Sequence, residues 1–217
     1  MHKINWPPAN SNWGSMNRFE TAHGPSTALI VIDLQAAFVE KGYPAYGPHA
    51  ADAVAPSNRL AAAVRAAGGV VVYTRHATLD DPVRGPPAWQ RERADLAAYF
   101  ASLEPGSAGY ALDAGLDVRD EDLVVDKVRY SAFLPISSPL DEMLRARGVD
   151  TVIITGTVTN VCCESSARDA HMLGYRVFFI ADATAAATDE AHNASLAILG
   201  TVFADVRTTE AMMALLC

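Results

Sequence analysis

Thr151-Val152-Ile153-Ile154-Thr155-Gly156-Thr157-Val158-Thr159-Asn160-Val161-Cys162 is the stretch of sequence that decides the fold of this chain. An apolar, β-branched run that ends at a glycine and precedes an Ala-containing polar segment is typical of a strand, a tight turn and a helix. The Cys162 thiol then falls on the first turn of a helix, at the carboxyl edge of a buried strand. Free N–H groups of a helix N-terminus favour a thiolate, and ligands of open parallel sheets bind at that edge. The stretch therefore predicts a parallel sheet and a nucleophile.

Apolar runs alternate with helix-like segments on both sides of this stretch. We predict strands at 28–32, 70–74, 123–126, 151–155, 176–180 and 202–204, and helices at 51–67, 139–147, 164–173, 189–199 and 208–215. This alternation predicts right-handed crossovers and a three-layer α/β/α sandwich around a central, mostly parallel six-stranded sheet. Between them, 76–120 is a long excursion rich in Pro and Gly, with one short helix near 90–100.

Composition limits the class of protein. The chain has 217 residues, of which 50% are hydrophobic, and this suits one domain over 27–217 after an irregular arm over 1–26. A net charge of −8 without a basic stripe argues against nucleic acid as a partner, and no apolar run is long enough to indicate a membrane partner. The arm lacks the apolar stretch of a signal peptide, and three cysteines form no disulfide framework, so we expect a reducing cytoplasm. Trp6 and Trp13 in the arm, with the Ala-rich helices, favour a homodimer or homotetramer.

Three polar residues follow apolar strands: Asp33, Lys127 and Cys162. Because the carboxyl ends of parallel strands meet at one edge, the three could converge into an acyl-transfer site. Asp33 would accept the thiol proton, Lys127 would hold Asp33 and stabilise the thiolate, and backbone N–H groups at and before Cys162 would bind the oxyanion. Taken singly, each residue also has an ordinary explanation: Asp33 as a turn former at a strand end, Lys127 as a solvated lysine, and Cys162 as a small buried thiol.

Three motifs together resemble the isochorismatase-like cysteine hydrolases, over 28 to about 215. They are Ala28-Leu29-Ile30-Val31-Ile32-Asp33-Leu34-Gln35 with Phe38, then Asp126-Lys127-Val128-Arg129-Tyr130-Ser131-Ala132-Phe133, and Thr155 to Cys162 continued through Asp169-Ala170. The resemblance implies a catalytic triad of Asp33, Lys127 and Cys162. It also implies a cis peptide bond between Thr157 and Val158, and an oxyanion hole made by the backbone N–H groups of Val158 and Cys162. Cys163 falls one position beyond the nucleophile of the family, with its side chain directed into the core.

Details within the family narrow the expected reaction. Members that cleave a vinyl ether lack the nucleophilic Cys, so Cys162 implies an amidohydrolase that attacks a small amide, ureide or carbamoyl compound and forms a thioacyl-enzyme intermediate. Nicotinamidase-like members bind a metal through an Asp-x-His motif. Here 39–52 contains only His49, with Asp52 three residues on, so we expect no metal and no cofactor. The segments 127–133 and 159–165 are most similar to ureidoacrylate hydrolases, and also to N-carbamoylsarcosine and biuret amidohydrolases.

The candidate substrate-binding residues lie in or near these motifs and are Gln35, Phe38, His76, Arg129, Tyr130, Phe133 and Asn160. His76 has a structural alternative as a hydrogen-bonded strand-end residue, and Arg129 is equally a surface arginine or the partner of a substrate carboxylate. Trp89 either covers the pocket or packs at a subunit contact. Three other functions stay open: a nicotinamidase-like or isochorismatase-type hydrolase, a catalytically silent small-molecule-binding relative, and a redox protein using the vicinal cysteines, which are poorly placed for a disulfide.

Overall fold

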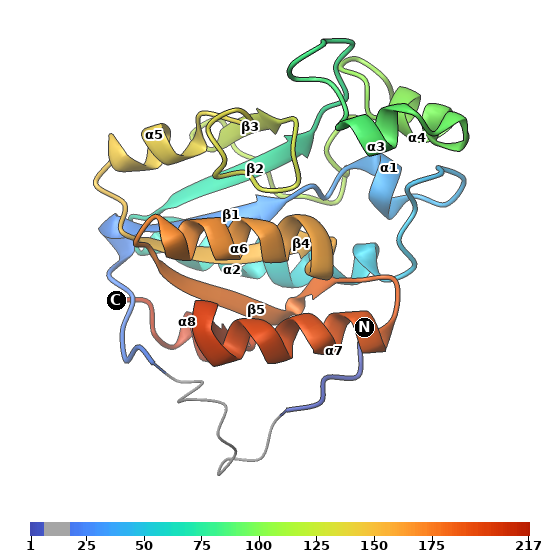
Figure 1. Cartoon of the computed structure of the whole chain (residues 1–217). Coiled ribbons are helices and arrows are strands. Elements are labelled where there is room, and N and C mark those ends of the chain that lie inside the picture. Colours follow the sequence, from blue (N-terminus) through green and yellow to red (C-terminus); the bar gives the residue numbers. More distant parts are fainter. Residues whose placement is uncertain (7–17) are drawn as a thin grey trace.

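The computed structural model, which describes residues 1–6 and 18–217, contains one central sheet (Figure 1). Its strands are β1 (Thr27–Ile32), β2 (Val70–His76), β3 (Leu123–Lys127), β4 (Thr151–Thr157), β5 (Arg176–Ala185) and β6 (Asp205–Arg207). Their order is β3-β2-β1-β4-β5-β6, and every pairing between them is parallel. This confirms the predicted sheet. Chain order reverses between β1 and β4, which is where open parallel sheets bind ligands.

Helices cover both faces of the sheet, as predicted (Figure 1). Their bounds are α1 (Ala36–Val39), α2 (Val54–Ala66), α3 (Ala88–Arg91), α4 (Ala97–Ser102), α5 (Leu140–Arg145), α6 (Glu164–Met172), α7 (Asp189–Ile198) and α8 (Thr209–Met213). The helices α5, α6 and α7 pack on one face, and α2 and α8 pack on the other. The two layers bury the central strands on both faces, whereas the edge strand β3 exposes Val124, which is 41% exposed.

Strand β1 shows why this sequence forms a central strand. Ala28, Ile30 and Ile32 point into the core beneath α5, α6 and α7, whereas Leu29 and Val31 point into the core beneath α2. All of these side chains are wholly buried. A continuous apolar run, rather than an alternating one, is what a strand covered on both faces requires.

Two strand predictions need correction. The fifth strand continues past Ile180 and ends at Ala185. The prediction of a sixth strand at 202–204 is wrong. Leu199–Phe203 instead forms a π-helical turn that extends α7, and β6 follows it as Asp205–Arg207. Asp205 can occupy a buried strand because its carboxylate accepts the N–H groups of Arg18 and Phe19, at 2.8 and 3.0 Å, and pairs with Arg207 at 2.7 Å.

The part of the arm around Ala22 lies along the last residues of the chain, 215–217. The Ala22 N–H donates to the Leu215 carbonyl at 2.8 Å, and the Cys217 N–H donates back to the Ala22 carbonyl at 3.1 Å. Trp6 is exposed, and Trp13 lies outside the described residues. None of the helices in the described ranges combines the length and the apolar character that a membrane crossing requires.

Candidate active site

Three strand ends bring Asp33, Lys127 and Cys162 together. Asp33 follows β1, Lys127 is the last residue of β3, and Cys162 lies in the turn after β4. Lys127 Nζ is 2.7 Å from Asp33 Oδ2 and 3.4 Å from Cys162 Sγ. Asp33 and Lys127 are wholly buried, and Cys162 is 5% exposed. The lysine therefore contacts both the acid and the thiol in a site from which bulk water is excluded.

The backbone and a neighbouring strand orient the Asp33 carboxylate. Asp33 has a φ of 51°, a left-handed conformation that is uncommon for a non-glycine residue and best tolerated by Asp and Asn. Its N–H donates to the carbonyl of Thr74 at 3.2 Å, and Thr74 Oγ1 donates to Asp33 Oδ1 at 2.7 Å. Apart from its ion pair with Lys127, Oδ2 accepts no directed hydrogen bond from the described residues. A lone pair on Oδ2 is thus available to accept a proton.

A tight turn after β4 presents Cys162. Gly156, which pairs with Ile32, has a φ of 110°, and a Cβ there would lie 2.0 Å from the Ile32 carbonyl oxygen. The peptide bond between Thr157 and Val158 is cis. The Val158 carbonyl accepts the N–H groups of Val161 and Cys163, at 3.0 and 3.2 Å. These bonds wind Thr159–Cys163 into a π-helical turn ahead of α6.

The two adjacent cysteines face different environments. Cys162 Sγ contacts Lys127, whereas Cys163 Sγ lies 3.8 Å from the Thr155 carbonyl, and Cys163 is wholly buried. Burial raises the pKa of both thiols, and it raises the pKa of Cys163 well above its ordinary value. Cys163 therefore belongs to the core, and Cys162 is the thiol that meets the polar centre.

The resting Cys162 is a thiol. Burial raises its pKa to about 12, the Lys127 ammonium opposes this rise, and the Asp33 carboxylate adds to it. The favourable effect of a helix N-terminus, expected from the sequence, is therefore outweighed by desolvation. Burial also lowers the pKa of Lys127, but Asp33 and Cys162 raise it by more, so that its net pKa is raised and the ammonium is retained.

His76, at the end of β2, completes the polar centre. Its Nδ1 lies 3.3 Å from Lys127 Nζ. Because an ammonium only donates, Nδ1 accepts and the ring proton is on Nε2. Burial, followed by the charges of Lys127 and Arg129, holds the pKa of His76 well below its ordinary value, so the ring is neutral. Asp33, His76 and Cys162 offer ligand atoms within 4.8 Å of one another, but Lys127 Nζ contacts all three. A cation at that point is therefore already supplied by the chain.

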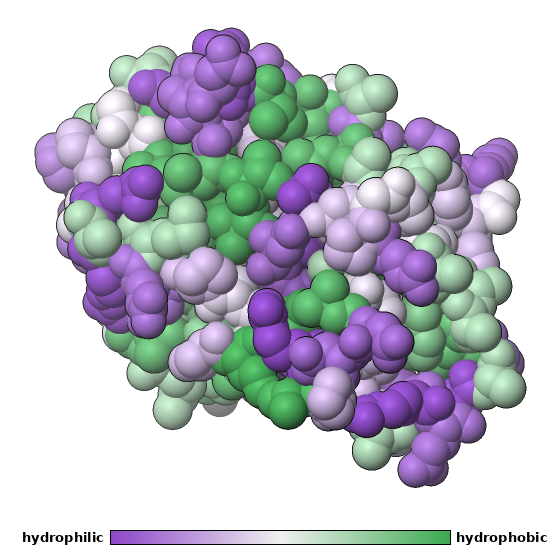
Figure 2. Space-filling model, turned by 90° about the horizontal axis from the view of Figure 1, so that it is seen from above, coloured by the Kyte–Doolittle hydropathy of each residue, from purple (hydrophilic) through white to green (hydrophobic). Residues whose placement is uncertain are grey.

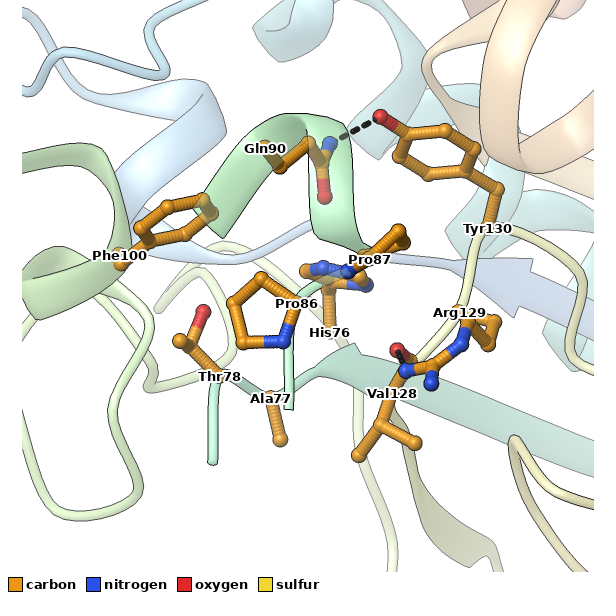
Figure 3. Close-up of a pocket in the computed structure, with 10 residues that line it drawn as sticks. All are labelled: His76, Ala77, Thr78, Pro86, Pro87, Gln90, Phe100, Val128, Arg129 and Tyr130. Carbon is orange, nitrogen blue, oxygen red and sulfur yellow. Dashed lines mark hydrogen bonds between the residues drawn. The ribbon is translucent and has the colours of Figure 1, made fainter. Parts of the chain in front are cut away.

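His76 also belongs to the wall of a small pocket (Figure 3). It is lined by His76, Ala77, Thr78, Pro86, Pro87, Gln90, Phe100, Val128, Arg129 and Tyr130, and its volume is about 30 Å³. Gln90 Nε2 donates to the Tyr130 hydroxyl, so the Gln90 carbonyl oxygen, which points into the pocket, and the Tyr130 proton stay available to a ligand. Sequence reasoning missed Gln90 and Thr74. Gln90 lies in the excursion over 76–120, and nothing in the local pattern marks its position over the site.

The structure divides the predicted substrate-binding residues into two groups. His76, Arg129 and Tyr130 line the pocket. The other four do not: Gln35, Phe38, Phe133 and Asn160. Phe38 packs with Ala37 and Leu103, Phe133 lies in the main core, and Asn160 is exposed on the turn before Cys162.

Two of these residues use their polar groups to hold backbone segments. Gln35 donates to the carbonyls of His76 and Tyr110, at 3.1 and 3.0 Å, and accepts the His76 N–H at 2.7 Å. Arg129 donates to the carbonyls of Val83 and Gly85, at 2.7 and 2.9 Å. Gln35 thus ties β1 to β2, and Arg129 fixes the beginning of the excursion beside the pocket.

A second, open cleft lies on the same side of the molecule as β3 and α5. Its lining includes Val83, Phe133, Pro135 and Ile136. Figure 2 views the molecule from above and shows apolar side chains gathered between hydrophilic ones on that side. Leu134 and Ile136 are 40% and 41% exposed. The cleft shares only Phe133 with the residues predicted to bind substrate.

Comparisons with known proteins agree with this fold. The family model described as the Isochorismatase domain matches residues 27–211. Ureidoacrylate amidohydrolase RutB of Variovorax paradoxus is 36% identical over 181 residues, which are 75% of this chain and 69% of that protein. The protein of the same name from Stutzerimonas stutzeri is 36% identical over 203 residues, 85% of this chain and 80% of that one.

Solved structures give the same assignment. A cysteine hydrolase from Pseudomonas syringae pv. phaseolicola superposes with a TM-score of 0.83 and 32% identity, covering 92% of this chain and 95% of that one. N-carbamoylsarcosine amidase from Thermoplasma acidophilum superposes with a TM-score of 0.69 and 27% identity, covering 85% of this chain and 97% of that one. With its parallel sheet and the cluster of Asp33, Lys127 and Cys162 at the strand ends, this chain belongs to the isochorismatase family.

Proposed function

We propose that this chain is a cysteine amidohydrolase that cleaves a C–N bond of a small amide, ureide or carbamoyl compound. One observation carries the proposal: Lys127 Nζ contacts both the Asp33 carboxylate and the Cys162 thiol at a buried centre, and His76, which contacts the same ammonium, also lines a small pocket. Similar proteins are named as amidohydrolases or amidases, which supports a reaction at a C–N bond.

The proposed reaction begins with a proton transfer. Asp33 Oδ2 accepts the Cys162 proton as Sγ bonds to the substrate carbonyl carbon, and the Lys127 ammonium stabilises the sulfur as it becomes anionic. Because the pKa of the resting thiol is about 12, the free enzyme holds little thiolate at neutral pH, and a base beside the sulfur is needed. The carbonyl oxygen becomes an oxyanion and accepts hydrogen bonds from the N–H groups of Val158 and Cys162.

The second half of the reaction returns the enzyme to its starting state. Asp33 donates the proton to the leaving nitrogen, the C–N bond breaks, and ammonia or an amine departs. Asp33 then accepts a proton from water, whose oxygen attacks the thioacyl carbon. The C–S bond breaks, the acid is released, and Cys162 regains a proton from Asp33. The atoms balance with water as the only co-substrate.

The pocket supports a ureide as the first substrate class to test. Gln90 offers an acceptor, and Tyr130 and His76 offer donors, which match the N–H and C=O groups of a neutral urea-type head. The named activity of the RutB proteins makes ureidoacrylate the first compound in that class.

Ammonia release over a panel of amides tests the proposal. The panel is ureidoacrylate, N-carbamoyl amino acids, biuret, maleamate and nicotinamide, and the proteins are wild type, Cys162→Ser and Cys163→Ser. We expect release from at least one compound, its loss in Cys162→Ser, and its retention in Cys163→Ser. Turnover by Cys162→Ser within tenfold of wild type would overturn the covalent mechanism. If no compound of the panel releases ammonia and Cys162 does not react with an alkylating agent, the protein is better explained as a small-molecule-binding relative.

We propose further that the protein is a cytoplasmic homodimer or homotetramer. The free thiols of Cys162 and Cys163 suit a reducing compartment, and the exposed Leu134 and Ile136 provide apolar area for a subunit contact. Analytical ultracentrifugation of wild type and of the double variant Leu134→Glu/Ile136→Glu checks the assembly. An unchanged oligomer in the variant would remove this surface from the contact.

A further inference from the structure

The first residues of the chain lie against the start of α7, far away in sequence (Figure 1). The Lys3 N–H donates to Asp189 Oδ1 at 3.3 Å, and the Asn5 N–H donates to Asn193 Oδ1 at 2.7 Å. Asn193 Nδ2 donates back to the Lys3 carbonyl at 2.9 Å. These bonds use backbone atoms of the arm, so they fix its path without regard to the side chain at position 3.

This path buries the imidazole of His2. Its side chain is only 3% exposed, its Nε2 accepts the Ala186 N–H at 2.9 Å, and its Nδ1 lies 2.8 Å from Asp189 Oδ1. Because Nε2 accepts a hydrogen bond, the ring proton is on Nδ1 and is donated to Asp189. Both nitrogens of a neutral ring are therefore used, just beyond the end of β5.

The surroundings of His2 also contain the donor types of a metal site. His2, His49 and Asp189 offer ligand atoms within 4.8 Å of one another. A metal on His2 Nδ1 would require the proton to move to Nε2, where it would meet the N–H of Ala186. Two donors would then face each other in a buried place. The arrangement therefore fits a docked neutral histidine better than a metal ligand.

Two further contacts join His2 to the turn that carries Cys162. The ring of His2 stacks on the ring of His192, with centroids 4.2 Å apart and an angle of 13° between the planes. His192 is wholly buried, and its Nδ1 lies 2.9 Å from Thr159 Oγ1. Thr159 follows Val158 and begins the π-helical turn that contains Cys162. The arm is thus connected by side-chain contacts to the part of the chain that sets the thiol and the Val158 amide.

We propose that His2 is a positioning residue for the nucleophile turn. Ala186 and Asp189 hold His2, His2 holds the ring of His192, and His192 holds Thr159 in the orientation that presents Cys162 to Asp33 and Lys127. The inference rests on the proposed function in one respect, that Cys162 is the reacting group. Small displacements of a nucleophile have large effects on its reaction rate. The effect of His2 on Cys162, although indirect, can therefore be measured as a change in rate.

The rate constant for alkylation of Cys162 by iodoacetamide tests the inference without any substrate. The proteins are wild type, His2→Ala, His2→Gln and the matched control Lys3→Ala, all in a Cys163→Ala/Cys217→Ser background. We expect His2→Ala to lower the alkylation rate constant by about threefold to thirtyfold. On any compound that the ammonia-release panel identifies as a substrate, kcat should fall by a similar factor, with KM within about twofold. His2→Gln keeps an acceptor for Ala186 and should lie between wild type and His2→Ala. Lys3→Ala should match wild type.

A double-mutant cycle separates positioning from general stability. Thr159→Val removes the hydroxyl that contacts His192, and in that background His2→Ala or His2→Gln should change the alkylation rate constant by less than about twofold. Equal effects of the His2 substitutions in both backgrounds would overturn the proposal. So would a lower melting temperature with an unchanged alkylation rate constant. If alkylation responds as expected but no amide is turned over, the proposed function fails and the positioning role stands.

Discussion

Thr74 Oγ1 donates a hydrogen bond of 2.7 Å to Asp33 Oδ1. The bond crosses from β2 to the end of β1, where Ile32 and Thr74 are paired in register. With Oδ1 occupied by Thr74, Oδ2 is the oxygen that meets Lys127. The orientation of the proposed general base therefore depends on a hydroxyl from the neighbouring strand.

Thr74→Val keeps the shape of the side chain and removes this donor. We expect kcat to fall by about tenfold or more, and the free energy of unfolding to fall by about 1–3 kcal/mol, because a buried carboxylate oxygen loses its partner. Thr74→Ser should restore most of both. Steady-state kinetics and urea unfolding measure the two quantities, and a Thr74→Val enzyme with wild-type kcat would contradict the role.

The ion pair of Asp33 and Lys127 predicts a non-additive effect on stability. Lys127→Met leaves a buried carboxylate without a counter-charge, and Asp33→Asn leaves a buried ammonium, so each should lower the free energy of unfolding by about 3–5 kcal/mol. The double variant buries neither charge. Its loss in the free energy of unfolding should therefore be smaller than the sum of the losses of the two single variants. Asn tolerates the positive φ at position 33. Chemical denaturation provides the measurement, and strict additivity would count against a tightly coupled pair.

The protonation of Cys162 predicts how alkylation depends on pH. Since burial raises the pKa of the thiol to about 12, the rate constant with iodoacetamide should rise about tenfold per pH unit between about 7 and 10, without a plateau. The Cys163→Ala/Cys217→Ser background isolates the signal of Cys162. A plateau reached below pH 8 would instead mean that a thiolate paired with Lys127 is the resting state.

Two buried histidines predict a loss of stability in mild acid. Burial is the largest cause of both shifts: it lowers the pKa of His192 to about 4 and holds that of His76 well below its ordinary value of 6.5. Their neutral forms favour the folded state, so the contribution is present above pH 6.5 and is lost as the pH falls towards 4. For His192 it amounts to at most about 3 kcal/mol.

Urea unfolding at pH 7.5, 5.5 and 4.5 measures this loss. The His192→Gln variant, which cannot be protonated at position 192, should show a smaller decrease in the free energy of unfolding between pH 7.5 and 4.5 than wild type. A wild-type free energy of unfolding that stays constant over this interval would contradict the assignment of both rings as neutral and buried.

The hydrogen bonds of Arg129 predict how its replacement changes KM for different substrates. Its guanidinium donates to the carbonyls of Val83 and Gly85, so Arg129→Ala should loosen the pocket wall for every ligand. We expect KM to rise by a similar factor, about threefold to tenfold, for ureidoacrylate, which bears a carboxylate, and for biuret, which does not. A rise confined to the carboxylate compound would show that Arg129 binds the substrate directly.

The convergence of Asp33, Lys127 and Cys162 could be predicted because it depends on few things. Each residue follows an apolar run that forms a buried strand, and parallel strands deliver their carboxyl ends to one edge. The prediction needed neither loop geometry nor side-chain packing. The glycine at position 156 adds a local signal, since only a residue without a Cβ fits against Ile32.

The pocket could not be predicted in the same way, because its parts meet only in the folded chain. Gln90 reaches Tyr130 from a short helix, α3, whose position beside Tyr130 is set by tertiary packing. Gln35 looked available to a substrate, but backbone groups of His76 and Tyr110 use its amide. The misplaced sixth strand has a similar cause: Asp205 is a poor strand former in isolation and is accommodated by N–H groups of the arm.

The contact of Lys127 with Asp33, His76 and Cys162 means that the positive charge of the centre is covalently attached to the chain. Unlike a bound metal ion, such a charge cannot be removed by dilution or by a chelating agent, and no other metal ion can take its place. Its desolvation takes place once, during folding, and is offset there by the Asp33 carboxylate. The folding reaction itself therefore puts the positive charge of this cluster in place beside the Asp33 carboxylate.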